Sequence, residues 1–573
     1  MSQQEQNDKS QHFYRASAAD FMKIPGAPVA YWASEKELSC FERYPAISDF
    51  ATSSNGVQTG NNGKYVRCWY EVSYRDIAKK WFPYNKGGSF RKWYGNYEFV
   101  VNWLDNGKDI KSEKNSCARG EEYYFTEGIT WSDVTSGKLS CRYLPKGFVF
   151  DASGPSAFFE DKDLTFVGLA LMNTSFANYW SKILNPTLHF QSGDFRKITL
   201  SPNFIARDVI DCSRQLVELT KHDWDDFEIS IDYNVCGILK NRHETLRESY
   251  VSLRAIWEQR TKDSASLEQK NNTLFSEAYG LDSESITSVS LQDVTLTCNP
   301  QYRYGGNRTE DEYEKLLMGD TVEEFLSYSI GCMMGRYSID EPGLILASQG
   351  ETLQDYLNQI QTPRFIPDND AILPLTDQEW FADDVTNRVR EFVKVVWGEE
   401  TLQENLAFIA ESLCLHAIKS KKGESAIETI RRYLSTQFYK DHLKTYKKRP
   451  IYWLFSSGKE KAFECLVYLH RYNESTLARM RTEYVTPLMG KYDAQQSLQQ
   501  EQLNDASPAQ QRELEKQLKD LAKKQTELRA FDENLKHYAD MRIKLDLDDG
   551  VKVNYGKFGN LLADVKAITG DKE

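Results

Sequence analysis

The spacing of apolar residues predicts a β-containing region in the first third of the chain. Between residues 35 and 205, short runs of β-branched and aromatic residues end at turns rich in Gly, Asn and Asp. Residues 97–103 form one such run, which ends at Asp105-Asn-Gly107, and residues 147–150 form another. Such runs bounded by turn residues are typical of short strands joined by loops.

Helical periodicity begins near residue 204, where Ile205, Val209, Leu216 and Leu219 recur at spacings of three, four and seven. Further helices are expected over residues 241–279 and 313–334, with a short strand at 294–297 between them. Residues 350–480 are expected to be mostly helical. One apolar face of this region is marked by Trp380, Val385, Val389, Phe392 and Val396.

The clearest periodicity lies near the C-terminus, where apolar residues fall three or four positions apart with one position skipped. They are Leu514, Leu518, Leu521, Leu528, Phe531, Leu535, Tyr538 and Met541. With Glu and Lys between them, this pattern predicts a coiled coil or a long helical hairpin. We favour a hairpin that packs on its own domain over a dimerisation stem, because the run covers only about four heptads.

These patterns together predict an α+β fold, with a mixed α/β domain followed by a mostly helical C-terminal domain and a coiled-coil-like hairpin. Residues 1–20 are expected to be a disordered leader. The other expected segments are 21–205 (the α/β domain), 206–349 (a helical spacer with the remainder of that domain), 350–492 (the helical domain) and 493–573 (the heptad hairpin and tail).

Length and composition limit the class of protein. The chain has 573 residues, enough for two to four domains, and a net charge of −13. No uncharged apolar window reaches the roughly 18 residues of a membrane span, and the polar N-terminus lacks the apolar core of a signal peptide. Its 10 cysteines include no Cys-x-x-Cys pair. These features favour a cytoplasmic protein without membrane association.

Positive charge is concentrated in two segments of this acidic chain. Residues 64–93 carry eight basic and two acidic residues, a net charge of +6, with nine interleaved aromatic rings. Residues 419–449 carry ten basic and three acidic residues, a net charge of +7. Basic groups beside aromatic rings suit nucleic acid, whose phosphates and bases they contact. An aromatic core with a solvated basic face explains the first segment equally well, and the second is a weak signal alone.

Motifs for catalysis are absent from the sequence. The segment Gly60-Asn-Asn-Gly63-Lys64 ends like a phosphate-binding loop, but Gln58 and Tyr65 replace the first glycine and the magnesium-binding hydroxyl of that motif. The eight histidines are isolated. We therefore expect no catalytic residue, no metal ligand and no cofactor site in this chain.

One short segment resembles a methyl-transfer loop. Asn299-Pro-Gln-Tyr302 follows the expected strand at 294–297 and is similar to the Asn-Pro-Pro-Tyr loop of amino-methyltransferases. Gln301 replaces the second proline, and no glycine-rich turn for S-adenosylmethionine precedes the segment. A turn with a packed tyrosine is the favoured interpretation.

Several longer blocks identify a family resemblance. They include Lys23-Ile-Pro-Gly-Ala-Pro-Val-Ala-Tyr-Trp32, Gly56-Val-Gln-Thr-Gly-Asn-Asn-Gly-Lys-Tyr65, Leu144-Pro-Lys-Gly-Phe-Val-Phe-Asp151 and Gly331-Cys-Met-Met-Gly-Arg-Tyr-Ser338. They resemble the part of BREX phage-defence adenine methyltransferases of the PglX type that follows the catalytic domain, over about residues 20–570. Fused restriction–modification methyltransferases carry related blocks.

The resemblance implies a division of labour between two halves. In the family, an N-terminal domain binds S-adenosylmethionine and carries the Asn-Pro-Pro-Tyr loop, and a C-terminal half recognises the DNA target and contacts the rest of the defence system. This chain resembles the second half, so the catalytic domain is expected to be absent from it. The expected partners are double-stranded DNA, a methyltransferase catalytic domain and other BREX proteins.

The resemblance and the basic segments together give a set of candidate DNA-binding residues. Thr59, Gly60, Asn61 and Asn62 are expected to form the first loop of the recognition domain. Phosphate contacts are expected from basic side chains, with Trp69 and Trp93 packed beneath some of them: Lys64, Arg67, Lys79, Lys80, Arg91, Lys92, Lys447, Lys448 and Arg449.

The sequence therefore leaves three hypotheses. The first is the DNA target-recognition and scaffolding portion of an N6-adenine DNA methyltransferase. The second is an active methyltransferase that uses Asn299-Pro-Gln-Tyr302 as a degenerate loop, and the third is a protein-interaction scaffold built on residues 350–573.

Overall fold

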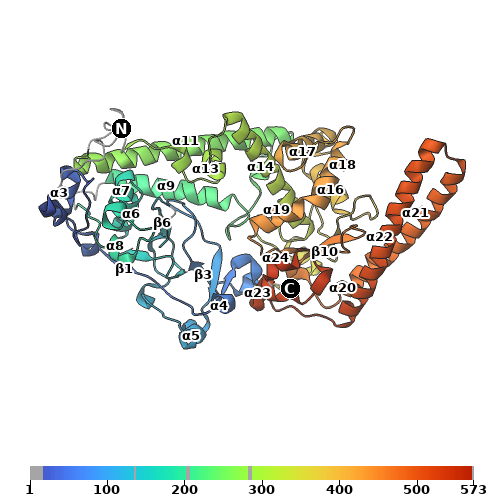
Figure 1. Ribbon diagram of the computed structural model, residues 1–573, viewed down its shortest axis with the longest axis horizontal. Helices are drawn as coiled ribbons and strands as arrows, with labels where there is room; N and C mark the ends of the chain where they lie inside the picture. The colour runs from blue at the N-terminus through green and yellow to red at the C-terminus, as the bar shows by residue number, and fades with distance from the viewer. Residues whose placement is uncertain (1–16, 135–136, 202–206, 282–286, 571–573) are drawn as a thin grey trace, which may run out of the picture. The chain divides into compact units, whose positions relative to one another are not determined.

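The computed structural model describes residues 17–134, 137–201, 207–281 and 287–570 (Figure 1). Within these ranges helices predominate and the strands are short and gathered in small sheets, which confirms the predicted α+β class. Of the expected leader, residues 1–16 lie outside the described residues, and Ala18–Phe21 form the short helix α2. No helix in the described ranges is both long enough and apolar enough to cross a bilayer.

The chain divides into two compact units, and neither is a single stretch of sequence. Unit 1 comprises residues 1–66, 78–224 and 256–307, and unit 2 comprises residues 67–77, 225–255 and 308–573. The five consecutive segments expected from the sequence stay a prediction.

Unit 1 contains two small groups of strands. In the first, neighbouring strands pair antiparallel in the order β1-β8-β5-β6, and in the second β3 pairs antiparallel with β4 and parallel with β7. Their bounds are β1 (Ala51–Ser54), β3 (Trp81–Asn85), β4 (Phe99–Asn102), β5 (Gly128–Trp131), β6 (Cys141–Leu144), β7 (Val149–Phe150) and β8 (Ser156–Phe159). The strands β4 and β7 confirm the two runs expected at 97–103 and 147–150.

The helices of unit 1 lie around these strands. They are α3 (Glu35–Arg43), α4 (Asn62–Tyr65), α5 (Leu104–Ser112), α6 (Lys162–Met172), α7 (Ser175–Leu184), α8 (Ser192–Phe195), α9 (Arg207–Asp225), α11 (Leu246–Tyr279) and α13 (Pro300–Tyr304). The boundaries between the units fall within β2 (Val66–Cys68), after residue 77, at the end of α9, within α11 and after residue 307. The helix α11 confirms the one expected at 241–279. In α9, Val209 and Leu216 are buried as expected, and Ile205 lies outside the described residues.

The strand expected at 294–297 is wrong. Residues 294–299 form an irregular connection between a 3₁₀ turn, Leu291–Asp293, and α13. The backbone N–H groups of Thr297 and Cys298 donate to the Asp223 carboxylate, at 2.7 and 2.9 Å, in place of a strand partner. A buried side chain thus satisfies donors that a β-ladder would otherwise satisfy.

Unit 2 is largely helical and contains one small sheet. Its helices are α10 (Gly237–Lys240), α14 (Glu310–Met333), α15 (Leu353–Gln359), α16 (Val385–Trp397), α17 (Leu402–His416), α18 (Ala426–Thr436), α19 (Phe438–Thr445), α20 (Thr476–Arg479), α21 (Thr486–Asp505), α22 (Pro508–Asp540), α23 (Gly550–Gly556) and α24 (Val565–Thr569). The antiparallel sheet has the order β10-β11-β9, with bounds β10 (Tyr452–Ser456), β11 (Glu464–Tyr468) and β9 (Ile372–Pro374). The pattern over 350–480 did not predict this sheet.

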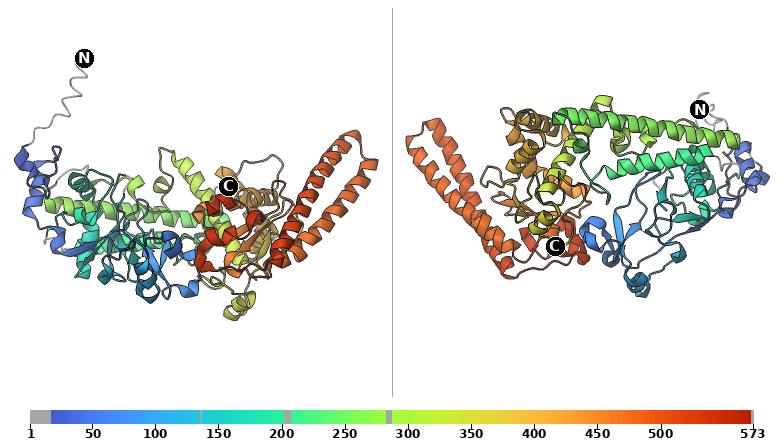
Figure 2. Two further views of the ribbon diagram at one scale, coloured as in Figure 1. Left: turned by 60° about the horizontal axis from the view of Figure 1, so that its bottom comes forward. Right: turned by 180° about the vertical axis from the view of Figure 1, so that it is seen from behind.

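The heptad segment forms a helical hairpin within the chain. The helices α21 and α22 run side by side in every view (Figures 1 and 2). A capping box between Ser507 and Gln510, with Pro508 at the first helical position, starts α22. Near its end, Leu528 and Leu535 are fully buried in the core of unit 2. Coiled-coil packing in the strict sense stays a prediction.

Candidate nucleic-acid interface

The loop at residues 59–64 is held by its own polar side chains. The Asn61 side-chain oxygen accepts a hydrogen bond from the Lys64 backbone N–H at 3.1 Å and so caps α4. The Thr59 hydroxyl donates to the Asn62 side-chain oxygen at 2.7 Å. Gly60 has a φ of +73°, which glycine adopts without strain. Four of the expected DNA-binding residues therefore lie together in one ordered turn.

The helix α5 lies directly beside this loop. The Tyr65 hydroxyl donates to the Glu113 carboxylate at 2.9 Å and to the Asp109 carbonyl at 3.3 Å. The hydrogen bond from Tyr65, helped by Lys64 at 3.5 Å, holds the pKa of the Glu113 carboxyl below its usual value. The exposed side chain of Lys64 is thus placed at the junction of α4 and α5.

Residues 108–114 contribute basic side chains that sequence reasoning missed. Lys108, Lys111 and Lys114 are exposed, and their spacing of three is a helical signal that could have found them. Lys111 pairs with Glu121. Lys108 and Lys114 make no ion pair among the described residues.

Lys79 and Lys80 join the same end of unit 1. The Trp103 backbone N–H donates to the Lys80 carbonyl at 2.9 Å, so the two lysines adjoin the residue where α5 begins. Lys79 is exposed and Lys80 is half-buried. We call residues 59–64, 79–80 and 104–119 the α4–α5 surface; Figure 1 labels α4 and α5, and residues 79–80 directly precede the labelled strand β3.

Arg91 and Lys92 lie in the interior of unit 1, with 4% and 7% of their surface exposed. The Arg91 guanidinium pairs with Asp223 at 3.3 Å, bonds Thr297 and lies over the Trp224 ring. The Lys92 ammonium pairs with Glu268. These contacts argue against the phosphate role expected for both residues, because phosphate binding requires an accessible cation.

Arg67 is also engaged inside its unit, where 7% of its surface is exposed. Its guanidinium donates from Nε and Nη2 to the Asp548 carbonyl, at 3.0 and 2.7 Å. Burial lowers the pKa of this group, and the nearby Glu71 carboxylate partly offsets the effect. Arg67 therefore joins Arg91 and Lys92 as a structural cation.

The segment 447–449 reverses the chain after α19. Lys447 and Lys448 are exposed and adopt φ values of +50° and +58°, which are uncommon for residues with a side chain. Arg449 is half-buried and lies 3.5 Å from the Glu71 carboxylate. Of these three residues, Lys447 and Lys448 are the exposed ones.

The aromatic rings of the first basic segment are mostly core residues. Six of the nine are buried: Tyr65, Trp69, Tyr70, Trp81, Tyr84 and Trp93. The Arg336 guanidinium, itself fully buried, lies over the Trp69 ring at 5.3 Å, and the Trp93 indole N–H donates to Glu268. Packing in the hydrophobic core therefore accounts for most of these rings. The basic side chains expected to lie above Trp69 and Trp93 are buried in the interior.

The Asn299 side chain is fully used in capping α13. Its amide N–H₂ donates to the Leu291 and Val294 carbonyls at 2.7 and 2.8 Å, and its oxygen accepts from the Gln301 N–H. The Tyr302 hydroxyl donates to the Phe90 carbonyl at 2.5 Å. Since a methyl-transfer loop needs a free Asn oxygen and an accessible ring, this segment has the geometry of a structural turn.

One group of potential metal ligands occurs in the described part of the chain: Asp320, Glu323 and His416. The His416 Nε2 lies 3.1 Å from the Asp320 carboxylate and 3.2 Å from the Leu316 carbonyl, and Nδ1 lies 3.9 Å from Glu323. The hydrogen bond to Asp320 raises the pKa of His416, and burial with nearby carboxylates raises that of Glu323 to about 8. The three side chains therefore contact one another directly, through the His416 hydrogen bond and the ion pairs to Asp320 and Glu323.

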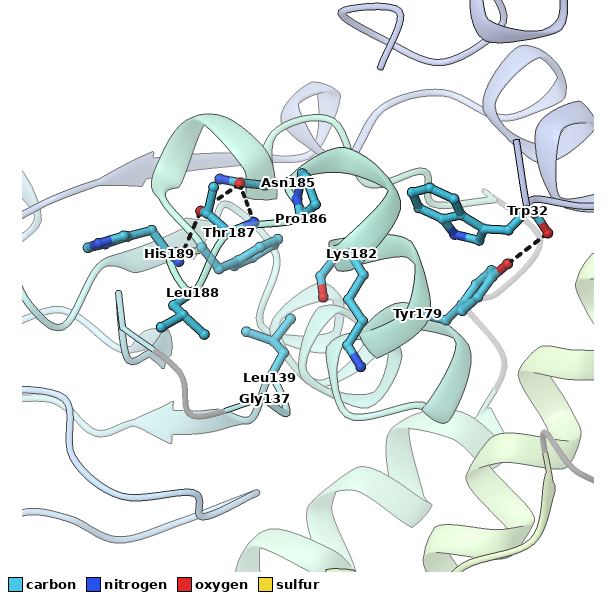
Figure 3. A pocket seen from close by; sticks show the side chains of 12 residues that line it. Trp32, Gly137, Leu139, Tyr179, Lys182, Asn185, Pro186, Thr187, Leu188 and His189 are labelled. Carbon is cyan, nitrogen blue, oxygen red and sulfur yellow. Dashed lines mark hydrogen bonds between the residues drawn. The ribbon is translucent and has the colours of Figure 1, made fainter. Parts of the chain in front are cut away.

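A cavity of about 360 Å³ opens elsewhere in unit 1 (Figure 3). Its wall is largely apolar, with Trp32, Leu139 and Tyr179 among its rings and alkyl chains, and Lys182 and His189 as its basic side chains. None of the DNA-binding residues expected from the sequence lines it.

Two known proteins similar to the chain are adenine-specific methyltransferases. It is 48% identical over 562 residues to the adenine-specific methyltransferase BrxX of Escherichia coli strain HS, a match that covers 96% of this chain and 46% of BrxX. The adenine-specific methyltransferase PglX of Lacticaseibacillus casei strain Zhang is 36% identical over 593 residues, covering 98% of this chain and 46% of PglX. The chain is homologous to part of these methyltransferases.

This similarity confirms the resemblance to PglX-type adenine methyltransferases that the sequence blocks indicate. The chain spans about half the length of the curated BrxX and PglX proteins that it matches. No family model matches the chain.

Proposed function

We propose that this chain is the DNA target-recognition portion of an adenine-specific DNA methyltransferase of a BREX phage-defence system. The observation that carries the proposal is the α4–α5 surface, where exposed lysines lie on α4, on α5 and the turn after it, and on the segment before β3. Homology to methyltransferases named adenine-specific supports a DNA substrate. In this proposal Lys64, Lys79, Lys108 and Lys114 bind phosphates, while Arg67, Arg91 and Lys92 hold the fold.

Salt dependence of duplex binding tests the proposal directly. Binding of the full chain to duplex DNA should weaken with salt, with a slope in log–log form of about −0.9 for each phosphate neutralised. The double substitution Lys108→Gln and Lys114→Gln should reduce the magnitude of that slope by about 1–2, measured by fluorescence anisotropy across a salt series.

A matched control is Lys315→Gln in unit 2, because Lys315 is exposed but already paired with Asp311 within α14. Its slope should equal that of the unsubstituted chain. Absence of binding at low salt, or an unaltered slope in the double variant, contradicts the role of the α4–α5 surface.

We do not propose that these 573 residues catalyse methyl transfer by themselves. The Asn299 amide is consumed by the cap of α13, so the segment that resembles a catalytic loop lacks a free acceptor for the target amine. We propose that S-adenosylmethionine and the reacting adenine are bound by a catalytic domain outside this sequence, with other BREX proteins as further partners in the cytoplasm.

A second candidate function, a docking scaffold, has one supporting observation. The end of the hairpin near the turn between α21 and α22 carries Leu498, 54% exposed, and partly exposed Leu503, Leu514 and Leu518. Replacement of residues 500–516 by a short loop keeps the buried Leu521, Leu528 and Leu535, whereas a larger deletion exposes the core. If the hairpin docks a BREX protein, this shortened chain should lose co-purification with that protein and retain duplex binding.

A further inference from the structure

Two loops of unit 1 are locked together at the centre of the α4–α5 surface. The backbones of Gln58 and Cys117 exchange two hydrogen bonds, at 2.8 and 2.9 Å. At Gly60, an added Cβ would lie 2.6 Å from the Lys114 carbonyl oxygen, so the loops approach more closely than any side chain allows. Residues 113–117 are therefore held in a fixed position beside residues 58–63.

Three exposed asparagines lie on these loops, and they differ in which side-chain atoms remain available for a hydrogen bond to another molecule. The Asn61 oxygen caps α4, and the Asn62 oxygen accepts from Thr59. The Asn115 side chain makes no hydrogen bond within the described part of the chain. Asn115 alone among the three thus keeps both its acceptor oxygen and its donor N–H₂ free.

Adenine in the major groove presents an N7 acceptor and an N6 amino donor side by side. A free carboxamide matches this pair with two parallel hydrogen bonds, which is the common way for Asn to read adenine. Both atoms must be unengaged, a condition that Asn61 and Asn62 fail and Asn115 meets.

The backbone and the charges around Asn115 favour such a contact. Asn115 has a φ of +64°, a left-handed conformation that Asn tolerates better than most residues, and it occupies the tip of the turn after α5. Exposed Lys114 directly precedes Asn115 in this turn, and exposed Lys108 lies within α5. Phosphate contacts position a protein on the duplex, and a side chain next to them can reach a base edge.

We infer that Asn115 is a specificity-determining residue that reads one adenine of the DNA target by paired hydrogen bonds in the major groove. This inference rests on the proposed DNA-binding function and assigns one base contact within it.

The test separates base reading from phosphate binding in the full-length chain. The substitution Asn115→Gly removes the carboxamide at a position whose backbone suits glycine, so the turn should persist. Preferred sites are first selected from duplexes with randomised positions. Dissociation constants are then measured for the selected duplex and for duplexes with each adenine replaced, at several salt concentrations.

The expected result is a position-specific one. The unsubstituted chain should prefer adenine at one position by about 5- to 100-fold, and Asn115→Gly should lose that preference with its salt slope unchanged. The matched variant Lys114→Gln should show the reverse: an unchanged base preference and a slope smaller by about 1. Thermal unfolding of all three chains checks that the fold is retained.

Two outcomes overturn the inference and leave the proposed function standing. One is salt-dependent binding of the unsubstituted chain with no base preference. The other is an adenine preference that Asn115→Gly retains at every position. No duplex binding by the unsubstituted chain at low salt overturns both the inference and the proposed function.

Discussion

Basic residues in this chain have two different environments, which the sequence does not distinguish. Arg91 and Lys79 both fall in the segment with net charge +6, yet Arg91 pairs with a buried Asp223 and Lys79 faces solvent. The partner Asp223 lies 132 residues away in sequence, so no local pattern reveals the pair. The family resemblance predicted the polar loop at 59–62, and the structure shows that its hydrogen bonds connect residues only three positions apart.

The substitution Arg91→Ala should reduce stability rather than DNA affinity. It leaves the buried Asp223 carboxylate without its cation, which typically costs about 3–5 kcal/mol of unfolding free energy. Urea denaturation measures the loss. The exposed counterpart Lys79→Ala should change stability by less than about 0.5 kcal/mol. A folded, equally stable Arg91→Ala chain with weaker duplex binding would restore the phosphate role.

The Glu323 carboxyl should make stability fall as pH rises. Its pKa is raised from 4.5 to about 8 in the folded chain, so the folded state binds more protons than the unfolded state between these values. The substitution Glu323→Gln keeps a neutral side chain at every pH. It should therefore be more stable than the unsubstituted chain at pH 8, by roughly 1–3 kcal/mol, and similar to it at pH 5.

His416 adds to the same trend, because its raised pKa gives a stabilising charge that is lost as pH rises above that value. Chemical denaturation at pH 5, 6, 7 and 8 provides the profile, with the exposed Glu404→Gln as control. Parallel profiles for Glu323→Gln and the unsubstituted chain would contradict the assignment of the slope to Glu323.

At the scale of elements, long periodic helices were predictable, whereas the short strands of unit 2 were not. The helices α11 and α14 and the hairpin helix α22 follow from spacing, since each presents several turns of pattern. The strands β10 and β11 have five residues each and are buried on both faces, so they show no alternation that separates a strand from a buried helix. The third strand, β9, pairs with β11 from about 90 residues away (Cys465 opposite Pro374), which local patterns do not encode.

The turn after α19 tests whether the backbone strain at Lys448 is retained because its side chain binds DNA. Lys448 holds a φ of +58°, which costs a residue with a Cβ about 1–2 kcal/mol relative to glycine. Lys448→Gly should therefore leave the melting temperature unchanged or raise it, while duplex affinity falls and the salt slope shrinks by about 1. Unchanged affinity would exclude this turn from the DNA interface, and Thr445→Gly, within α19, serves as a backbone control that should destabilise.

At the scale of the whole molecule, the net charge of −13 conceals local basic surfaces. Overall acidity opposes indiscriminate attraction to nucleic acid, while in the function we propose the lysines of the α4–α5 surface supply a local positive field for the duplex. The charge distribution along the sequence locates the two basic segments. The structure shows which basic side chains of each segment are exposed.

Cofactor binding checks the proposed division of labour. Titration of the full chain with S-adenosylmethionine should give no heat and no thermal shift, because we place the cofactor site in a separate catalytic domain. A fused or co-expressed catalytic half should restore the signal. Saturable binding to this chain alone would contradict that division and reopen the possibility of catalysis by these residues.

The locked pair of loops constrains how target preference can be exchanged between related proteins. Residues 58–63 and 113–117 fit one another through the Gln58–Cys117 backbone pairing and the missing side chain of Gly60. A chimaera that receives only residues 113–117 from a relative would not fit the unchanged residues 58–63. The side chain at position 115 would then be held in a different orientation. Engineering a new target should therefore transplant both segments as one cassette, even though about 50 residues separate them in the sequence.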